Sequence, residues 1–405
     1  MKRVLIYDEI DREEWSRLVA SSATGTWFQT PEAYEFFASM PELFKPFVVA
    51  ISKEAPLSEA QHSINPSLQT LRAVCVGYVT VEKNPIKQFF TRRAIILGGP
   101  ALADDATDEE VMALLEAVKT KTRHPQSLYS DLHETTHQSA CMQAFRQSED
   151  LSLIAVEQQD ASQKHAALTK NTKNIFYRCE PIYIETRNFN DYSRWKNAFY
   201  AAGFDYQPHL NFHVDCTDKE AMWESLSENR KRQIKKGKPT QTLPKGMALA
   251  DVTEAGIREW YEILAELYRT KVKTPLWPVE FFLEAYRQKV GRFMLVQHEG
   301  KIIGGSMVVT DGKAVYEWFE CGMNTQYKDL FPSVTATWAG MQYSQETGCA
   351  RYDMMGAGVP GVPYGVRDFK SEFGGDMVEH GRFLCVCKPL LYKLGVLGVK
   401  ILKRK

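Results

Sequence analysis

Two stretches of the chain repeat the same order of elements, and this repeat constrains the fold more than any other feature of the sequence. In the first half, a strand that contains Gly77 leads to a helix, Gly203 and an aromatic strand. In the second half, a strand that contains Gly304 leads to a helix, Gly348 and a strand. Strands are indicated by alternating apolar residues, and helices by apolar residues three and four apart. The order predicts two copies of one α/β unit, the first with an insertion around residues 101–180, and the alternative is a chance similarity between the two halves.

The clearest single helix is predicted from Asp108 to Lys121. Its apolar residues follow the i, i+3, i+4 spacing that places them on one face of a helix, and they are Val111, Leu114, Leu115 and Val118. We therefore expect this face to be buried.

The composition is that of a folded protein without a charge bias. Of the 405 residues, 44% are hydrophobic and 25% are charged, which excludes a largely disordered chain. The 50 basic and 50 acidic residues cancel, so a globally basic nucleic-acid binder is disfavoured. Any contact with an anionic partner must then use a local basic patch.

Cysteine spacing and hydropathy predict a cytoplasmic protein. The eight cysteines contain no CxxC pair and form no dense framework, which favours reduced thiols. No apolar run reaches the length of about 18 residues that a membrane span needs. The apolar run after the basic start is too short for a signal peptide. His209 and His213 lie on a predicted strand, where the helical spacing of a zinc motif does not apply, so no metal site is expected.

A set of short motifs, each weak alone, occurs in a specific order along most of the chain. In the second half these are 299–305 (EGKIIGG), 316–320 (YEWFE), 352–358 (YDMMGAG), 364–375 (YGVRDFKSEFGG) and 379–383 (EHGRF). The first half adds 27–31 (WFQTP) and 97–100 (LGGP), followed by 230–236 (RKRQIKK). Together the motifs resemble the FemABX family, the aminoacyl-tRNA-dependent peptidyltransferases that form peptidoglycan bridges.

The resemblance implies an α/β (α+β) fold of two tandem domains of the GNAT acyltransferase type. The first domain would cover residues 1–216 with the insertion, and the second would cover residues 217–383. Residues 384–405 would form a C-terminal helix that returns to the first domain, where its apolar residues need cover and its lysines can stay solvated. Alternatively, a basic amphipathic segment of this kind can rest on a membrane surface.

In function, the resemblance implies transfer of an acyl group to an amine. The donor would be aminoacyl-tRNA or another acyl donor, the acceptor a cell-wall precursor or another small amine, and no cofactor is implied. A second hypothesis is an N-acyltransferase with an acyl-CoA or acyl-carrier donor. The turn at 324–333 has no glycine and so lacks the cradle that holds the pyrophosphate in acetyl-CoA-dependent enzymes, which counts against acetyl-CoA. A third hypothesis is a non-catalytic protein that binds a glycan or peptide.

The best-matched functional position is the Phe369–Lys370 dipeptide before a glycine pair. The resemblance places both residues at the acceptor and transition-state end of the site. An ammonium there can stabilise the oxyanion that forms when an amine attacks an ester carbonyl, or it can hold a phosphate. Without the resemblance, a solvated loop lysine is the simpler interpretation. Tyr364 and Arg367, from the same motif, are assigned to substrate binding.

Three carboxylates are candidates for the general base that takes the amine proton. They are Glu317, Glu320 and Asp353, of which Glu317 and Asp353 fall on adjacent strands. Each can instead be a strand carboxylate paired with a basic neighbour. Tyr316 and Trp318 are assigned to the lining of the substrate cleft, although an aromatic strand usually belongs to the core.

Asp218 is predicted to open a helix that runs to Lys236 and is basic at its end. The resemblance assigns a basic residue of this segment to a precursor phosphate, and we assign Arg232 and Lys235 to substrate binding. Cations also suit the C-terminal end of a helix dipole, so a purely structural role stays open.

Overall fold

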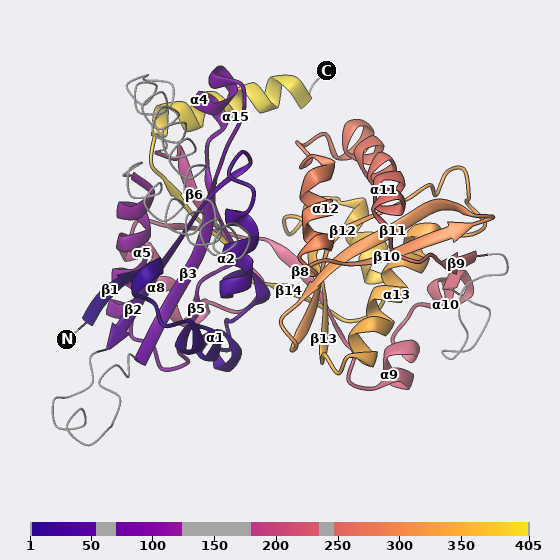
Figure 1. Ribbon diagram of the computed structural model, residues 1–405, viewed down its shortest axis with the longest axis horizontal. Coiled ribbons are helices and arrows are strands. Elements are labelled where there is room, and N and C mark those ends of the chain that lie inside the picture. The colour runs from indigo at the N-terminus through magenta and orange to yellow at the C-terminus, as the bar shows by residue number, and fades with distance from the viewer. Residues whose placement is uncertain (1, 54–69, 124–179, 235–246, 404–405) are drawn as a thin grey trace, which may run out of the picture. The chain divides into compact units, whose positions relative to one another are not determined.

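Two compact units make up the protein (Figure 1). The computed structural model describes residues 2–53, 70–123, 180–234 and 247–403. Unit 1 comprises Met1–Tyr206 and Arg382–Lys405, and unit 2 comprises Gln207–Gly381. The chain therefore leaves unit 1 once and returns to it after completing unit 2.

Unit 1 is built on an eight-stranded sheet of order β1-β2-β3-β4-β6-β15-β7, with β5 paired to β3. Its strands are β1 (Lys2–Ile6), β2 (Phe44–Lys53), β3 (Thr70–Thr80), β4 (Ala94–Gly98), β5 (Ala101–Leu102), β6 (Tyr183–Asn188), β7 (Asp205–Gln207) and β15 (Arg382–Val386). Its helices are η1 (Tyr7–Glu9), α1 (Arg12–Ser21), η2 (Trp27–Gln29), α2 (Pro31–Ala38), α4 (Pro85–Thr91), α5 (Asp108–Arg123), η4 (Ser193–Trp195), α8 (Lys196–Ala201) and α15 (Pro389–Lys403).

Both faces of this sheet are covered, which explains why its central strands are apolar throughout. Along β2, Phe47 and Val49 pack in the core cluster that contains α5 and α8. The intervening Val48 and Ala50 pack in the cluster that contains α1. The predicted helix from Asp108 is confirmed as α5, and all four residues of its apolar stripe are buried.

A buried glutamine bridges a gap in this sheet. β3 pairs with β4 only at Tyr78 and Val79, and with β5 only at Ala73 and Val74. Between these pairings, Gln29 Nε2 donates to the carbonyls of Val76 (3.1 Å) and Leu97 (2.8 Å), and Gln29 Oε1 accepts from the Val76 N–H (2.8 Å). The side chain thus replaces main-chain bonds that the strands do not make, which gives the WFQTP motif a structural reason.

Unit 2 is built on a seven-stranded sheet of order β14-β8-β13-β12-β11-β10-β9. Its strands are β8 (Leu210–Asp215), β9 (Met247–Leu249), β10 (Arg292–His298), β11 (Lys301–Thr310), β12 (Ala314–Gly322), β13 (Arg351–Gly356) and β14 (Asp376–Glu379). Its helices are α9 (Lys219–Glu224), α10 (Glu228–Ile234), α11 (Glu254–Leu267), the π-helix η5 (Tyr268–Val272), α12 (Val279–Arg287), α13 (Pro332–Glu346) and α14 (Gly365–Ser371).

The two sheets share one plan, so the prediction of two copies of one α/β unit is confirmed. The predicted match between the strand after Gly203 and the strand after Gly348 is wrong, because the counterpart of β13 in unit 1 is β6, which precedes Gly203. In each, a run of antiparallel strands ends in a parallel pair, β4 with β6 in unit 1 and β12 with β13 in unit 2. The next strand in each sheet comes from elsewhere in the chain: β15 joins unit 1 after unit 2 is complete, and β8 joins β13. The tandem α/β architecture is therefore confirmed.

Two boundaries differ from those predicted. Residues 207–216, assigned from sequence to the first domain, belong to unit 2 because β8 pairs with β13 and β14. The predicted helix from Asp218 is broken into α9 and α10, because the Ser227 hydroxyl accepts from the Arg230 N–H (3.0 Å) and so starts a new helix. Of the predicted insertion, residues 124–179 lie outside the described residues.

Within the described residues, no helix combines the length and the apolar character that crossing a bilayer requires. The C-terminal helix α15 belongs to unit 1. Its apolar residues are not covered as expected, since Leu390, Leu394 and Leu397 are exposed.

Candidate active site

The second sheet opens between its parallel strands. β12 and β13 pair only at Ala314↔Arg351, Val315↔Tyr352 and Tyr316↔Asp353. Both strands continue beyond this point, β12 to Gly322 and β13 to Gly356. The main-chain groups that face the opening must find other partners, so polar side chains are required there.

Lys370 is one of these partners. It lies on α14 and is 8% exposed, so the interpretation as a solvated loop lysine is wrong. Its ammonium donates to the carbonyls of Met354 and Gly356 (2.8 Å to the latter), both on β13 beyond the last pair with β12. Burial lowers the pKa of Lys370, and the negative charges of Glu317, Asp353 and Glu320 oppose this shift.

Glu317, on β12, is held by two hydroxyls. Its Oε1 accepts from Thr337 Oγ1 (2.8 Å) on α13 and from the Tyr352 hydroxyl (2.9 Å) on β13. Gly340 makes room for that hydroxyl, because a Cβ there would lie 2.4 Å from it. Burial raises the pKa of Glu317, and the charge of Lys370 opposes the rise.

Glu320 is the least neutralised carboxylate of the group. Its Oε1 is enclosed and has no hydrogen-bond partner within the described parts of the chain. Burial, together with the negative charge of Glu317, raises the pKa of Glu320 to about 7, and a hydrogen bond from Ser333 opposes the rise. A carboxyl with such a pKa exchanges protons near neutral pH, as a general base must.

Asp353, by contrast, is tied into the sheet. Its Oδ2 lies 3.2 Å from His213 Nε2, and its Oδ1 accepts from the Met355 N–H at 2.7 Å. Burial alone would raise the pKa of Asp353, but the hydrogen bond and charge of His213, with the charge of Arg351, hold it below its usual value. Asp353 therefore contributes a fixed negative charge near Lys370.

Arg230 fixes the helix that carries Lys370. Its guanidinium lies over the rings of Phe369 (4.7 Å) and Phe373 (4.2 Å) and donates to the Phe369 carbonyl at 2.8 Å. Glu372 pairs with it at 3.3 Å. Burial lowers the pKa of Arg230 to about 10, which the charge of Glu372 opposes. Phe369 thus anchors α14 through its ring and its carbonyl.

Arg230 is the buried basic residue of this segment, and it is not one of the two that were assigned to substrate binding from the sequence. Arg232 is exposed, and Lys235 lies outside the described residues. The signal that sequence analysis missed is Ile234, a buried apolar residue four positions after Arg230. Residues four apart share a helix face, so Ile234 marks Arg230 as the inward-facing arginine.

Arg367 orders the loop that leads into α14. Its guanidinium donates to the carbonyls of Ala357 (2.9 Å), Val359 (2.5 Å) and Val362 (3.1 Å). Tyr364 is 43% exposed at the start of α14 and packs against Gly358, where a Cβ would lie 2.9 Å from its ring. Of these two residues, Tyr364 has the surface that a substrate can touch.

The two aromatic residues assigned to a cleft lining belong largely to the core. Tyr316 is fully buried, and its hydroxyl donates to Asp311 at 2.9 Å. Trp318 is partly buried and meets the ring of Phe281 edge-on at 5.3 Å. Tyr316 therefore has no exposed surface in this structure.

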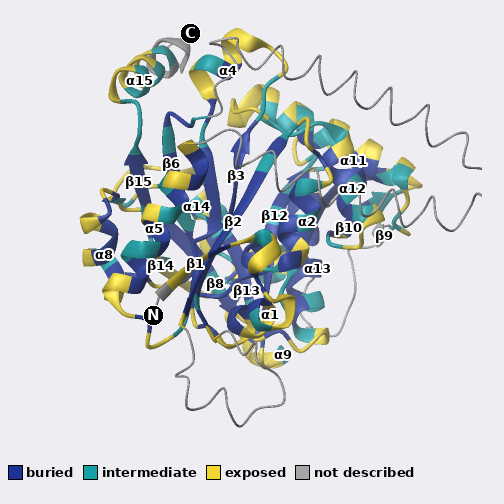
Figure 2. Ribbon diagram, turned by 60° about the vertical axis from the view of Figure 1, so that its left-hand side comes forward, coloured by how far each residue is buried: buried dark blue, intermediate teal, exposed yellow. Residues whose placement is uncertain are grey.

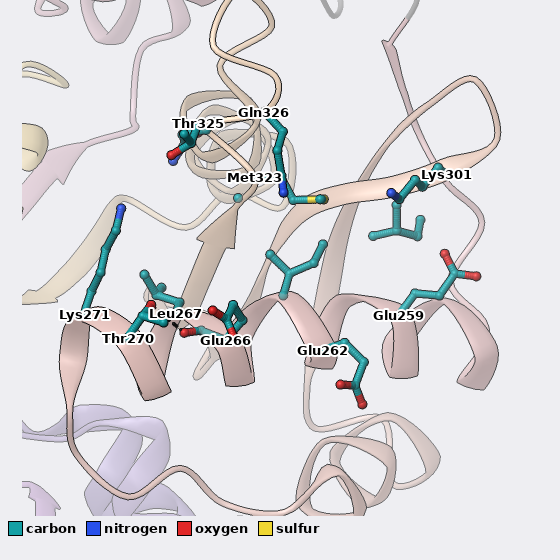
Figure 3. A pocket seen from close by; sticks show the side chains of 14 residues that line it. Glu259, Glu262, Glu266, Leu267, Thr270, Lys271, Lys301, Met323, Thr325 and Gln326 are labelled. Carbon is teal, nitrogen blue, oxygen red and sulfur yellow. Dashed lines mark hydrogen bonds between the residues drawn. The ribbon is translucent and has the colours of Figure 1, made fainter.

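A cavity of about 520 Å³ lies beside the end of β12 (Figure 3). One wall is α11 with η5, and the other is the turn between β12 and α13. Polar residues occur on both walls, among them Glu259, Glu262, Lys271, Thr325 and Gln326, and apolar side chains such as Leu267 and Met323 line the rest. The cavity adjoins Gly322, at the end of β12.

The sequence of this region matches a known family. Residues 283–397, which include β12, β13 and α14, match the model of the FemAB family. This part of the chain is therefore similar to the FemAB family. Among curated proteins, none matches its sequence.

Three solved structures are similar to most of this chain. The crystal structure of FemX matches 97% of this chain and 99% of its own, with 12% identity and a TM-score of 0.57. A tandem GNAT protein from the clavulanic acid biosynthesis pathway matches 95% of this chain and 98% of its own, with 8% identity and a TM-score of 0.44. The L-PGS of Bacillus licheniformis matches 80% of this chain and 86% of its own, with 12% identity and a TM-score of 0.41. Of these three scores, that of FemX is high enough to establish a shared fold.

The contrast between the two arginines gives a test of how α14 is held. Replacing Arg230 with methionine leaves the Phe369 carbonyl without its donor and removes the contacts with two rings. We expect Arg230→Met to lower the free energy of unfolding by about 2–4 kcal/mol, measured by urea denaturation. The matched variant Arg232→Met should change it by about 0.5 kcal/mol or less, because Arg232 is exposed. Equal losses in the two variants would contradict the anchoring role of Arg230.

Proposed function

We propose that this FemAB-like chain transfers an acyl or aminoacyl group from an activated ester to an amine, at the opening between β12 and β13. The observation that carries the proposal is the ammonium of Lys370. Two of its three N–H groups bind the carbonyls of Met354 and Gly356. The third has no hydrogen-bond acceptor in the described parts of the chain. This N–H, fixed by the other two bonds, is suited to bind a developing oxyanion.

Glu320 is the general base in this proposal. The amine nitrogen attacks the ester carbonyl, a C–N bond forms, and the carbonyl electrons move to oxygen beside Lys370. Glu320 takes the proton that the amine loses. When the tetrahedral intermediate collapses, the C–O bond breaks and the leaving alkoxide receives a proton. A carboxyl with a pKa of about 7 can accept the first proton and donate it to the second site.

The substrates we propose follow from the FemAB likeness. They are aminoacyl-tRNA as donor and an amine of a cell-wall precursor as acceptor. Acyl-CoA is disfavoured by the turn before α13. Pro332 has no N–H, and the N–H of Ser333 is already donated to Asn324 Oδ1 at 3.2 Å. Two main-chain positions that could bind a pyrophosphate are therefore unavailable at this helix start.

A comparison of donors tests the proposed reaction directly. We expect the purified protein to transfer amino acids from a mixed aminoacyl-tRNA pool to soluble cell-wall precursor peptides. We expect acetyl-CoA to show no stoichiometric micromolar binding in calorimetry. Micromolar acetyl-CoA binding would favour an acyl-CoA-dependent N-acyltransferase. Saturable precursor binding with no turnover on either donor would favour a non-catalytic binding protein.

The role of Lys370 is tested by its replacement with methionine. Loss of one preorganised electrostatic contact should lower kcat by about 10²–10³-fold on the donor and acceptor that support turnover. The same change leaves two carbonyls without a donor, so the free energy of unfolding should fall by about 1–3 kcal/mol. Assays are therefore run well below the melting temperature of Lys370→Met, with the exposed Lys328→Met as control. Near-wild-type kcat in a folded Lys370→Met protein would place the reaction elsewhere.

Glu320 is tested by the pH dependence of activity and stability. Since the base must be ionised, kcat/KM should rise with pH and level off above a midpoint near 7. Glu320→Gln should lower kcat/KM and remove this step. The folded protein binds the Glu320 proton more tightly than the unfolded chain, so stability should fall as pH rises from about 4.3 to about 7.

Glu320→Gln should remove that part of the pH dependence of stability, and the exposed Glu346→Gln should retain it. A wild-type pH profile in Glu320→Gln would assign the proton transfer to another group.

A further inference from the structure

Two short amphipathic helices lie side by side on unit 1. They are α4 (Pro85–Thr91) and the C-terminal helix α15 (Pro389–Lys403), which contact each other (Figures 1 and 2). They are far apart in the sequence but form one surface, which we call the α4–α15 surface. It is separate from β12, β13 and α14, which belong to unit 2.

Large apolar side chains are exposed on both helices. On α15, Leu390 is 78% exposed, and Leu394 and Leu397 are each more than half exposed. On α4, Ile86 is 66% exposed and Phe90 is 46% exposed. The spacing of four and three residues places each group on one face of its helix. Apolar residues gathered in this way on a surface mark an interaction site.

The position of α15 is fixed by its other face and by its start. The ring of Tyr392 meets that of Tyr183 at 5.5 Å, and Lys388 pairs with Glu180 at 2.7 Å. The N–H groups of Cys387 and Lys388 both donate to the Ile182 carbonyl at 2.9 Å. These contacts hold the helix against unit 1 while its leucine face stays exposed.

The charges of the α4–α15 surface are all of one sign. Residues 83–93 and 388–405 contain lysines and arginines but no aspartate or glutamate. Lys83 and Lys87 are exposed beside the apolar residues of α4, and Lys393 is exposed on α15. Lysines at the border of an apolar face can direct their charge outward while their stems cover apolar surface.

We propose that the α4–α15 surface binds the anionic surface of a lipid bilayer, with the leucine face of α15 and the apolar side chains of α4 inserted into the interface. Exposed leucine and phenylalanine flanked only by cations is the pattern of helices that lie in the plane of a membrane. Anionic lipids attract the lysines, so the charge and the apolar face act together. A second copy of this chain fits less well, because a symmetric contact would bring the lysines of both copies together.

Vesicle flotation of the full chain tests this proposal. The probe is vesicles of phosphatidylcholine with about 30% phosphatidylglycerol, compared with pure phosphatidylcholine at the same salt concentration. We expect the wild-type protein to float with the anionic vesicles and to bind the neutral ones about tenfold more weakly. Leu390→Gln/Leu394→Gln and Ile86→Gln/Phe90→Gln should each weaken binding about tenfold or more, since each pair removes inserted apolar surface.

A matched pair keeps the test specific to this surface. Val4→Gln/Tyr200→Gln replaces two exposed apolar residues of unit 1 outside it and should float like the wild type. Lys87→Glu/Lys393→Glu should lose the preference for anionic vesicles. The proposal is overturned if the wild type does not float or if the Leu390/Leu394 variant floats equally well. It is also overturned if sedimentation shows a dimer that only the leucine substitutions dissolve, because the surface would then join two copies.

Discussion

The early end of the pairing between β12 and β13 is the constraint on which the candidate site depends. After Tyr316↔Asp353 the two strands part, and the carbonyls of Met354 and Gly356 accept from the ammonium of Lys370. A buried ammonium is unfavourable unless negative charge surrounds it. Glu317, Glu320 and Asp353 provide that charge. The opening of the sheet thus accounts for the buried lysine, and the lysine in turn accounts for the three carboxylates around it. The pKa of Glu320 is raised by burial and by the charge of Glu317, and the charge of Lys370 opposes this rise.

Local sequence patterns were sufficient to predict features that depend on residues close together in the chain, such as helices and their buried faces. The helix from Asp108 and the presence of two α/β units were confirmed because apolar spacing indicates directly which face of an element is buried. The residue types of the site followed from the motifs, and the structure brings Glu317, Asp353 and Lys370 together as members of one electrostatic group. The residues of the candidate site were predicted from the order of the motifs. The spacing of residues within any one motif does not predict a contact between β12, β13 and α14.

Contacts between distant segments account for the errors. Arg230 and Arg232 differ little in sequence context, and only the packing of α10 against the Phe369 and Phe373 rings distinguishes them. The boundary at 216 was wrong because β8 pairs with a strand more than a hundred residues later in the chain. Which strand a given strand pairs with depends on the tertiary structure and cannot be predicted from the strand's own sequence.

The same sheet plan has different consequences in the two units. In unit 1, β4 and β6 stay paired over five positions, from Ala94↔Ile184 to Gly98↔Asn188. The gap in that sheet lies at β3 and is bridged by the neutral amide of Gln29, which satisfies the strands without leaving an exposed donor. In unit 2 the gap lies between the parallel strands β12 and β13. It is filled by the ammonium of Lys370, which uses two of its three N–H groups there. A neutral amide with matched donors and acceptors closes a sheet, whereas an ammonium on two carbonyls leaves one N–H for a ligand. Within the described residues, the gap in unit 1 is therefore closed by matched hydrogen bonds, and the gap in unit 2 keeps one N–H of Lys370 without an acceptor.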